Sequence, residues 1–256
     1  MKFLSWIKNR VRRRGQVEHH VPLGLAIRSH WLTGQDAEIE VDRSDGVSYT
    51  IRSREFFSIE GRLEALDEQS LQEARGRVLD VGAGAGRHSL RLQEAGHEVV
   101  AVDISPLCVE VMHQRGVEQV RVADIFSLDA EEFGDFDTVL FLMQSIGIAG
   151  SGFGLERLLL SLAPRLRRGG QVLLDSSPLL GTRSDCGPSL EGIDVSFSYQ
   201  GVAGEPFSWL YLDEKSLAEI SESLGWKTQI LARTATGEYL ARLLPPEKET
   251  THPGVG

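Results

Sequence analysis

The sequence predicts an α/β protein whose core is a doubly wound, parallel β-sheet covered by helices on both faces. From residue 77 onward, short apolar runs alternate with helical patterns, which is typical of parallel strands joined by helical crossovers. The runs are continuously apolar, as expected for strands that are buried on both faces. A glycine-rich turn follows the first run, and doubly wound sheets bind ligands at such a place.

The composition is that of a globular protein, with 41% hydrophobic and 25% charged residues among 256. It excludes whole-chain disorder and a collagen-like structure. The net charge of −10 argues against nucleic acid as a partner, because such binding rests on neutralising phosphates. Only Cys108 and Cys186 are present, so we expect no disulfide framework and a cytoplasmic location. The longest strongly apolar run, residues 139–143, is far shorter than the roughly 18 residues that span a bilayer.

Residues 1–14 form a basic extension, with six basic side chains and no acid. Phe3, Ile7 and Val11 have helical spacing, so the segment could lie on an anionic membrane surface as an amphipathic helix. We favour a solvated terminus, because a short basic helix is a weak signal. The apolar stretch is too short for a secretory signal.

Residues 15–76 have a mixed pattern. A turn at residues 45–46 separates two strand-like runs, residues 38–42 and 47–52, which predicts a small hairpin. A helix is expected over residues 60–73.

The remaining elements follow from alternation and from turn residues. We expect strands at residues 78–81, 99–102, 120–122, 138–143 and 171–174, and helices at residues 87–95, 107–115 and 155–166. A Ser-, Gly- and Pro-rich loop follows at residues 176–192. Alternation over residues 193–199 and 207–211, around a turn at 201–204, predicts a second hairpin with one aromatic face.

The C-terminal part is predicted to hold one more helix and two strands. Asp213 is placed to cap a helix over residues 214–224, which Gly225 would close. Strands are expected at residues 227–232 and 239–244, around a turn that contains Gly237. Residues 246–256 are expected to form a loose tail.

The glycine-rich turn is the most informative motif. Gly82, Gly84 and Gly86 follow the strand that contains Asp80, and glycines there let a ligand approach the backbone closely. A dinucleotide-binding fingerprint needs glycine at position 87, where this chain has Arg87.

The spacing, with acids closing the next two strands, resembles that of the class I S-adenosylmethionine-dependent methyltransferases. The resemblance covers residues 77–175 well and 213–244 in outline. It implies a Rossmann-like domain over residues 77–245 with a seven-stranded sheet, whose last strand is antiparallel. It also implies an insert at residues 176–212 and a substrate-side cover at residues 15–76.

The same resemblance assigns the cofactor, S-adenosylmethionine, to particular residues. Asp80 would lie by the methionine end, with Gly82, Gly84 and Gly86 beneath it. Asp103 would bind the ribose hydroxyls, Asp124 the adenine amine, and Ile104 and Ile125 the two purine faces; Leu142 begins the loop by the methionine. A carboxylate suits two vicinal hydroxyls because charge-assisted hydrogen bonds are strong. Taken alone, Asp103 could instead cap a helix and Asp124 could merely end a strand.

Methyl transfer from a sulfonium is an in-line displacement, so the protein mainly supplies proximity and alignment. The loop after the fourth strand places Met143 and Gln144 by the acceptor, and Gln144 could orient it. This loop lacks the Asn-Pro-Pro-aromatic or Asp-Pro-Pro-aromatic run that holds planar amines in relatives. His88 could act as a base, although an exposed position in the first helical turn is the favoured interpretation.

Aromatic residues outside the motifs suggest an apolar acceptor pocket. The candidates are Phe57, Tyr199, Trp209 and Tyr211, with filling of the protein core as the alternative. The histidines form no cluster with ligand spacing, so no metal is expected.

The sequence thus predicts an enzyme that transfers a methyl group from S-adenosylmethionine to a small-molecule acceptor. A nicotinamide-dependent oxidoreductase is the first alternative, and Arg87 argues against it. A non-catalytic module that binds S-adenosylmethionine is the second, because retained binding does not prove turnover.

Overall fold

The computed structural model describes residues 17–60, 63–128, 133–179 and 190–247. The basic extension at residues 1–14, Cys186 and most of the predicted C-terminal tail lie outside these ranges. Cys108 is a buried free thiol. Among the described helices, none has the length and apolar character needed to cross a bilayer.

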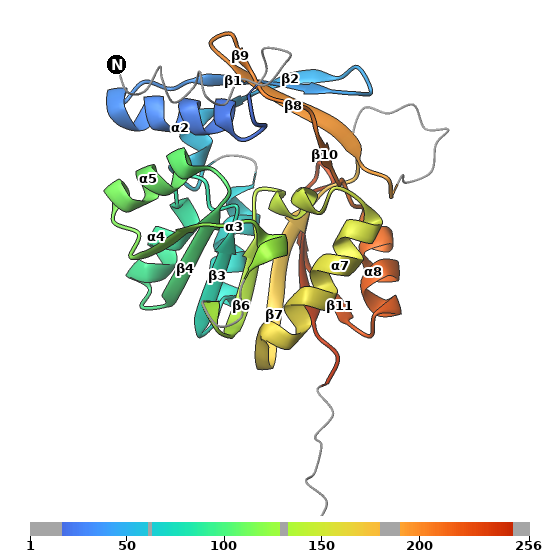
Figure 1. The fold of residues 1–256 in the computed structure, drawn as a ribbon. Coiled ribbons are helices and arrows are strands. Elements are labelled where there is room, and N and C mark those ends of the chain that lie inside the picture. Colours follow the sequence, from blue (N-terminus) through green and yellow to red (C-terminus); the bar gives the residue numbers. More distant parts are fainter. Residues whose placement is uncertain (1–16, 61–62, 129–132, 180–189, 248–256) are drawn as a thin grey trace, which may run out of the picture.

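The core is the predicted seven-stranded sheet, with the strand order β11-β12-β7-β6-β3-β4-β5. In chain order its strands are β3 (Arg77–Val81), β4 (Glu98–Asp103), β5 (Gln119–Val122), β6 (Phe136–Phe141), β7 (Leu166–Ser176), β11 (Lys227–Arg233) and β12 (Tyr239–Leu244). The last strand, β12, runs antiparallel to both of its neighbours, and the pairs among β3 to β7 are parallel. The predicted fold class is therefore confirmed (Figure 1).

Helices cover both faces of this sheet. On one face lie α3 (Glu64–Glu73), α4 (Arg87–Glu94) and α5 (Pro106–Arg115). On the other lie α7 (Gly152–Leu162) and α8 (Glu214–Ser223), packed on the largest apolar cluster. Short 3-10 helices complete the connections: η1 (Ser53–Phe56), η2 (Ile125–Ser127), η3 (Ser145–Ala149) and η4 (Ala163–Arg165). Asp213 caps α8 as predicted, because its Oδ1 accepts a hydrogen bond from the Ser216 N–H at 2.9 Å.

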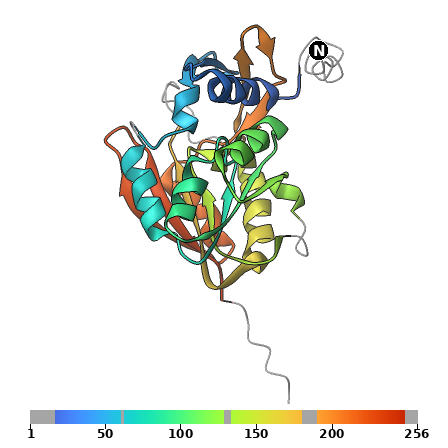
Figure 2. The same ribbon diagram turned by 90° about the vertical axis from the view of Figure 1, so that its left-hand side faces the viewer.

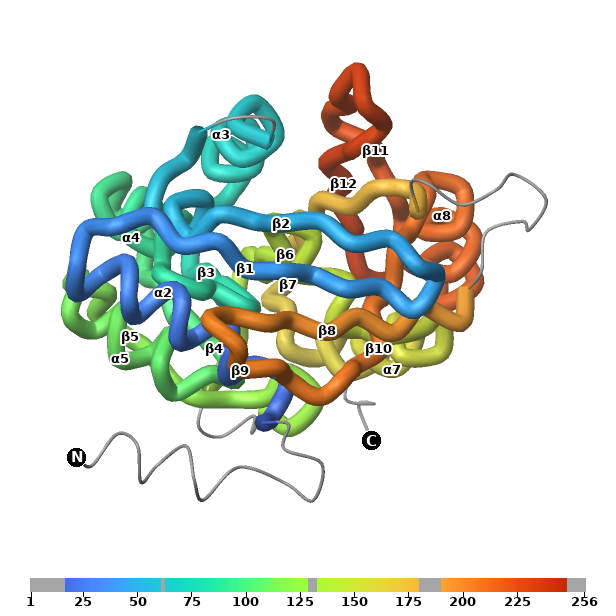
Figure 3. Tube along the Cα trace, turned by 90° about the horizontal axis from the view of Figure 1, so that it is seen from above, coloured from blue at the N-terminus to red at the C-terminus, as the bar shows by residue number. Residues whose placement is uncertain are grey.

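A second sheet lies above the carboxyl ends of the parallel strands, and we call it with its helix the cover (Figures 1 and 2). Its strands are β1 (Glu38–Arg43), β2 (Ser48–Arg52), β8 (Ile193–Tyr199), β9 (Val202–Ala203) and β10 (Phe207–Trp209), beside helix α2 (Val21–Thr33). Both predicted hairpins are present. The structure adds that they pair with each other through β1 and β8, although about 150 residues separate them in the chain. Figure 3 shows this sheet from above, lying across the parallel strands.

Several elements differ from the sequence analysis; among them, β6 and α7 both begin and end earlier than expected. Helix α2 was not predicted, although Pro22 stands in its first turn and Gly34 ends it in the left-handed conformation. Helix α3 begins at Glu64 and not at residue 60. Strand β7 spans 11 residues, because its ends pair beyond the apolar run that marked it.

Candidate functional site

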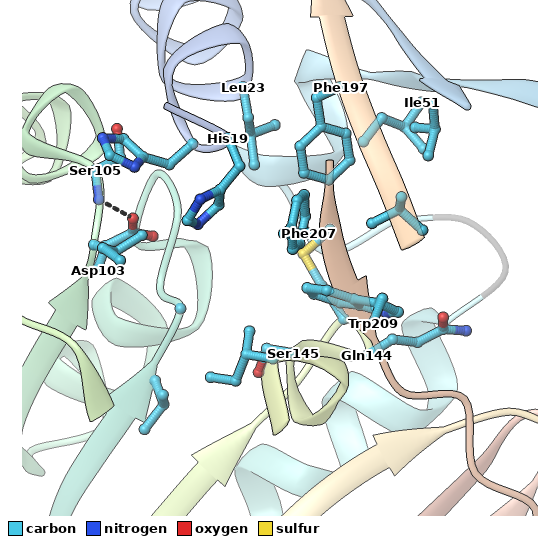
Figure 4. A pocket seen from close by; sticks show the side chains of 18 of the residues that line it. His19, Leu23, Ile51, Asp103, Ser105, Gln144, Ser145, Phe197, Phe207 and Trp209 are labelled. Carbon is cyan, nitrogen blue, oxygen red and sulfur yellow. Dashed lines mark hydrogen bonds between the residues drawn. The ribbon is translucent and has the colours of Figure 1, made fainter. Parts of the chain in front are cut away.

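A cavity of about 710 Å³ lies between the cover and the carboxyl ends of the parallel strands (Figure 4). This is the edge where open α/β sheets bind ligands. Most of the residues that the sequence analysis assigned to cofactor binding line one side, and aromatic residues of the cover line the other. The cavity is large and mostly apolar, with a few polar groups, as is typical of small-molecule sites.

Asp103 ends β4 at the cavity and is held by backbone donors. Its Oδ2 accepts from the Gly84 N–H at 2.9 Å, and its Oδ1 accepts from the Ser105 N–H at 2.8 Å. Ser105, and not Asp103, occupies the N-cap position of α5. Burial raises the pKa of Asp103 to about 6, against the lowering effect of these two N–H groups. The carboxylate is thus fixed in place beside the glycine turn.

The region around Asp124 forms the next part of the cavity wall. Asp124 follows β5, and its Oδ1 accepts from the Phe126 N–H at 2.9 Å. Ile104 and Ile125 both line the cavity. The Ile104 side chain is 41% exposed, so this apolar surface is open to a ligand.

The glycine turn has the backbone conformation that favours glycine. Gly82, Gly84 and Gly86 have φ angles of 70°, 57° and 79°. Of the three, Gly82 lines the cavity, Gly84 contacts the Phe56 ring, and Gly86 caps α4. Asp80 lies behind the turn, where burial raises the pKa of its carboxyl group and the Ser89 Oγ donates to it at 2.6 Å.

The loop after β6 is strained at two successive residues. Met143 and Gln144 have φ angles of 56° and 60°. Residues other than glycine rarely adopt this left-handed conformation, which costs about 1–3 kcal/mol for each residue. Both carboxylate oxygens of Asp175 accept from the Gln144 N–H at 3.1 Å, and burial raises the pKa of Asp175 to about 7. Gln144 Nε2 donates to Ser177 Oγ at 3.0 Å. With Leu142, both strained residues line the cavity.

Aromatic rings of the cover form a continuous wall on the opposite side (Figure 4). Phe207 contacts His19, Phe197 and Trp209, at ring-centroid distances of 4.7, 5.4 and 5.8 Å respectively. We call these four residues the aromatic wall. Tyr211 continues the lining, with its hydroxyl 3.4 Å from that of Tyr49, and burial raises its pKa.

Besides Asp80, Gly84 and Gly86, three further candidate residues do not lie in the cavity lining. The sequence analysis favoured an exposed position for His88, but this residue is buried, at 4% exposure, with its Nε2 2.9 Å from Asp67 Oδ1. Tyr199 is buried in the core of the cover, because β8 extends past the cavity. Phe57 stacks on His30 with the ring centroids 4.4 Å apart, and its neighbour Phe56 lines the cavity instead.

His19 is a cavity residue that the sequence analysis did not single out. It lies two residues before the start of α2, next to the N-cap residue His20, and the start of that helix was the signal that could have drawn attention to it. Its imidazole has no hydrogen-bond partner within the described residues. Burial lowers its pKa, although Glu18, Glu205 and Asp124 act in the opposite direction. The ring is therefore mainly neutral near pH 7 and can accept a proton.

Within the ranges that the structure describes, no three His, Cys, Asp or Glu side chains are grouped as metal ligands. The polar groups that line the cavity include the carboxylates of Asp103 and Asp124, the Gln144 amide, the His19 imidazole, the Arg43 guanidinium and the Tyr211 hydroxyl. The hydrogen-bond acceptors among them suit hydroxyl and amine donors of an organic ligand.

A family model described as a methyltransferase domain matches residues 78–170. A crystal structure of an S-adenosylmethionine-dependent methyltransferase from Bacteroides fragilis, in complex with S-adenosyl-L-homocysteine, is 36% identical. That similarity covers 88% of this chain and 95% of that chain, with a TM-score of 0.79. A sugar N-methyltransferase from Streptoalloteichus is 20% identical, with 72% of this chain and 86% of that chain covered and a TM-score of 0.51, so it shows the fold alone.

The curated relatives match over a shorter stretch. A ubiquinone biosynthesis O-methyltransferase from Xanthomonas oryzae is 39% identical over 74 residues, which are 27% of this chain. The chain thus spans about a third of the length of that relative, 31%.

Proposed function

Because this chain belongs to the S-adenosylmethionine-dependent methyltransferases, we propose that it transfers the methyl group to a hydroxyl of a small aromatic molecule. One observation carries the proposal: a single cavity has cofactor-type residues on one side and an aromatic wall on the other. Two ligands that share such a cavity meet at the border between its halves, where the methyl group would pass.

The cofactor half would hold the nucleoside and the methionine. Asp103 would accept the two ribose hydroxyls, because each carboxylate oxygen can accept more than the one N–H bond it has. Asp124 would accept from the adenine amine, with Ile104 and Ile125 on the purine faces. Gly82 and Leu142 would face the methionine, while Asp80, Gly84 and Gly86 would act from behind by shaping the turn.

The acceptor half would align a flat ring against Trp209 and Tyr211, with Met143 beside it. Gln144 is held by Ser177 and would orient the nucleophilic oxygen. His19 would accept the proton that this oxygen loses, since its neutral imidazole faces the cavity. Proximity and alignment would supply the larger part of the rate enhancement, by lowering the activation barrier by roughly 7–11 kcal/mol at best.

Oxygen is favoured as the acceptor atom by the O-methyltransferases among the curated relatives, although that match is local. The relatives named for N-methylation show only a shared fold. Membership of the methyltransferase family argues against the first alternative from the sequence analysis, a nicotinamide-dependent oxidoreductase. We further propose a cytoplasmic protein without a nucleic-acid partner, on the grounds of its charge and cysteine content, and without membrane contact by residues 1–14.

The test is turnover with methyl-labelled S-adenosylmethionine on matched phenols, catechols, anilines and aromatic acids. We expect label in a phenol or catechol, with little in the corresponding anilines. Label in the anilines alone would contradict oxygen as the acceptor. A protein that binds S-adenosylhomocysteine but labels none of the panel would favour the non-catalytic module.

A further inference from the structure

Arg87, the residue that breaks the dinucleotide fingerprint, lies almost fully buried between the glycine turn and the cover. Its guanidinium pairs with Asp67 of α3, which is 2% exposed. Its Nη1 also donates to two backbone carbonyls of the cover, Glu55 O at 2.8 Å and Ser58 O at 3.0 Å. One side chain thus joins α3, the start of α4 and the segment after β2.

Arg115, at the end of α5, reaches the same segment from the other side. Its Nη1 donates to Ala85 O in the glycine turn at 2.5 Å, and its Nη2 donates to Phe57 O at 3.0 Å. The guanidinium also lies over the Phe57 ring, 4.8 Å from its centroid. Two arginines therefore take three of the four carbonyls of residues 55–58, which we call the bridge segment.

The bridge segment places Phe56 directly on the glycine turn. A Cβ atom at Gly84 would lie 3.1 Å from Phe56 Cδ1, so the ring and the turn are in close contact. Phe56 also lines the cavity. The N–H of Gly84 in turn donates to Asp103. Contacts are therefore continuous from the two arginines, through Phe56 and Gly84, to the expected ribose ligand.

We propose that Arg87 and Arg115 are positioning residues that clamp the bridge segment onto the glycine turn and so control the release of the cofactor product. A guanidinium carries several fixed N–H donors and can hold two carbonyls at once, which a lysine cannot do with the same geometry. Weakening the clamp frees Phe56 from Gly84 and opens the cavity above the cofactor. The proposal rests on the cofactor half of the proposed function.

The variants must separate this role from simple folding. Arg115→Met keeps an unbranched side chain about as long as the methylene stem of arginine and removes both carbonyl bonds, and no acidic partner of Arg115 is found in the described residues. Arg87→Lys keeps a cation beside Asp67, because an uncharged residue would deprive that buried carboxylate of its arginine partner, although His88 Nε2 still lies 2.9 Å away. Arg91→Met is the matched control: Arg91 also lies on α4, but it pairs with Glu68 of α3 and does not touch the bridge segment.

The measurements are association and dissociation rates of S-adenosylhomocysteine by stopped-flow, with hydrogen exchange of residues 53–58. We expect dissociation from Arg115→Met and Arg87→Lys to be about tenfold faster, with association changed by no more than about threefold. S-adenosylhomocysteine should slow exchange in the bridge segment of the wild type and of Arg91→Met, and much less in the two clamp variants.

Two results would overturn the clamp. One is a lower melting temperature without a faster dissociation, since that pattern is purely structural. The other is an equal effect of Arg91→Met. If Arg115→Met does not fold, Arg87→Lys decides the question. A wild-type protein that does not bind S-adenosylhomocysteine at all would contradict the proposed cofactor half, and with it the function of the clamp.

Discussion

The indole of Trp209 lies so close to Gly147 that a Cβ atom at Gly147 would come within 2.2 Å of two indole atoms. Leu210 N donates to Gly147 O at 2.9 Å, so the backbones are joined at the same place. Gly147 belongs to η3, which directly follows the strained pair Met143 and Gln144. The aromatic wall is therefore fixed to the loop that borders the cofactor half.

Gly147→Ala should displace the indole and impair acceptor turnover. No left-handed φ is required at this position, so the backbone accepts alanine and the clash with Trp209 is the main effect. Overpacking of this kind costs about 1–3 kcal/mol. We expect a lower melting temperature and a turnover reduced by roughly tenfold to a hundredfold, with unchanged affinity for S-adenosylhomocysteine.

A double-mutant cycle provides the control. If the indole is the obstacle, Gly147→Ala should cost almost no stability in a Trp209→Ala background. Additive losses of melting temperature would mean that the alanine Cβ at position 147 clashes with another group, and the inferred contact between Gly147 and the Trp209 indole would be wrong.

Trp209→Ala should reduce acceptor turnover on the order of a hundredfold while it spares cofactor affinity. Trp209 is only partly buried and lines the cavity, so it is not a core residue. Melting temperature, cofactor affinity and turnover are measured on one preparation. Truncation of a fully buried Trp would cost roughly 3–5 kcal/mol; a loss of that size, or a weaker cofactor affinity, would assign Trp209 a structural role.

The seven-stranded sheet and the acids at its strand ends could be predicted because their signals are local. Asp103 ends a continuously apolar run and Asp124 follows the short run of residues 120–122, which places each carboxylate at the carboxyl end of a parallel strand, where it lines the cavity. No distant residue is needed to complete that inference.

The misplaced residues depend on distant partners. The burial of His88 is set by Asp67, which lies 21 residues earlier. Alternation placed Phe197 and Tyr199 on one face of β8, but the cavity ends between them, so that Tyr199 packs on the core of the cover. The pairing of β1 with β8 depends on contacts across about 150 residues, for which a single sequence holds no local signal.

S-adenosylhomocysteine should raise the melting temperature, and NAD should not. A ligand that binds only the native state stabilises it by about 2.7 kcal/mol at a hundredfold excess over its Kd. For a chain of this size, that corresponds to a shift on the order of 5–10 °C. Thermal denaturation with each ligand at millimolar concentration is the measurement. A shift with NAD and none with S-adenosylhomocysteine would contradict the cofactor assignment.

Affinity for S-adenosylhomocysteine should fall below about pH 6 because of Asp103. Burial raises its pKa to about 6, so the carboxyl group is protonated below that pH and accepts the ribose hydroxyls less well. Calorimetric titration from pH 5 to 8 should show an affinity loss approaching tenfold per pH unit at the acid end. Asp103→Ala should bind at least about tenfold more weakly at pH 8 and lose this pH dependence. A variant that retains it would mean that another group titrates.

His19→Gln should remove the acid limb of the turnover profile. Burial lowers the pKa of His19 from 6.5, so the imidazole is neutral above that range and can accept the proton of the acceptor hydroxyl. Turnover at saturating S-adenosylmethionine should therefore rise with pH in the wild type and level off near neutrality. The enzyme is saturated with S-adenosylmethionine so that the loss of cofactor affinity on protonation of Asp103 does not limit turnover. The variant should be slower by roughly a hundredfold, with a flat profile below pH 7. An acceptor that is already ionised, such as 4-nitrocatechol at pH 8, should lose much less than catechol does. Equal losses for both acceptors would show that His19 positions the ring and does not take the proton.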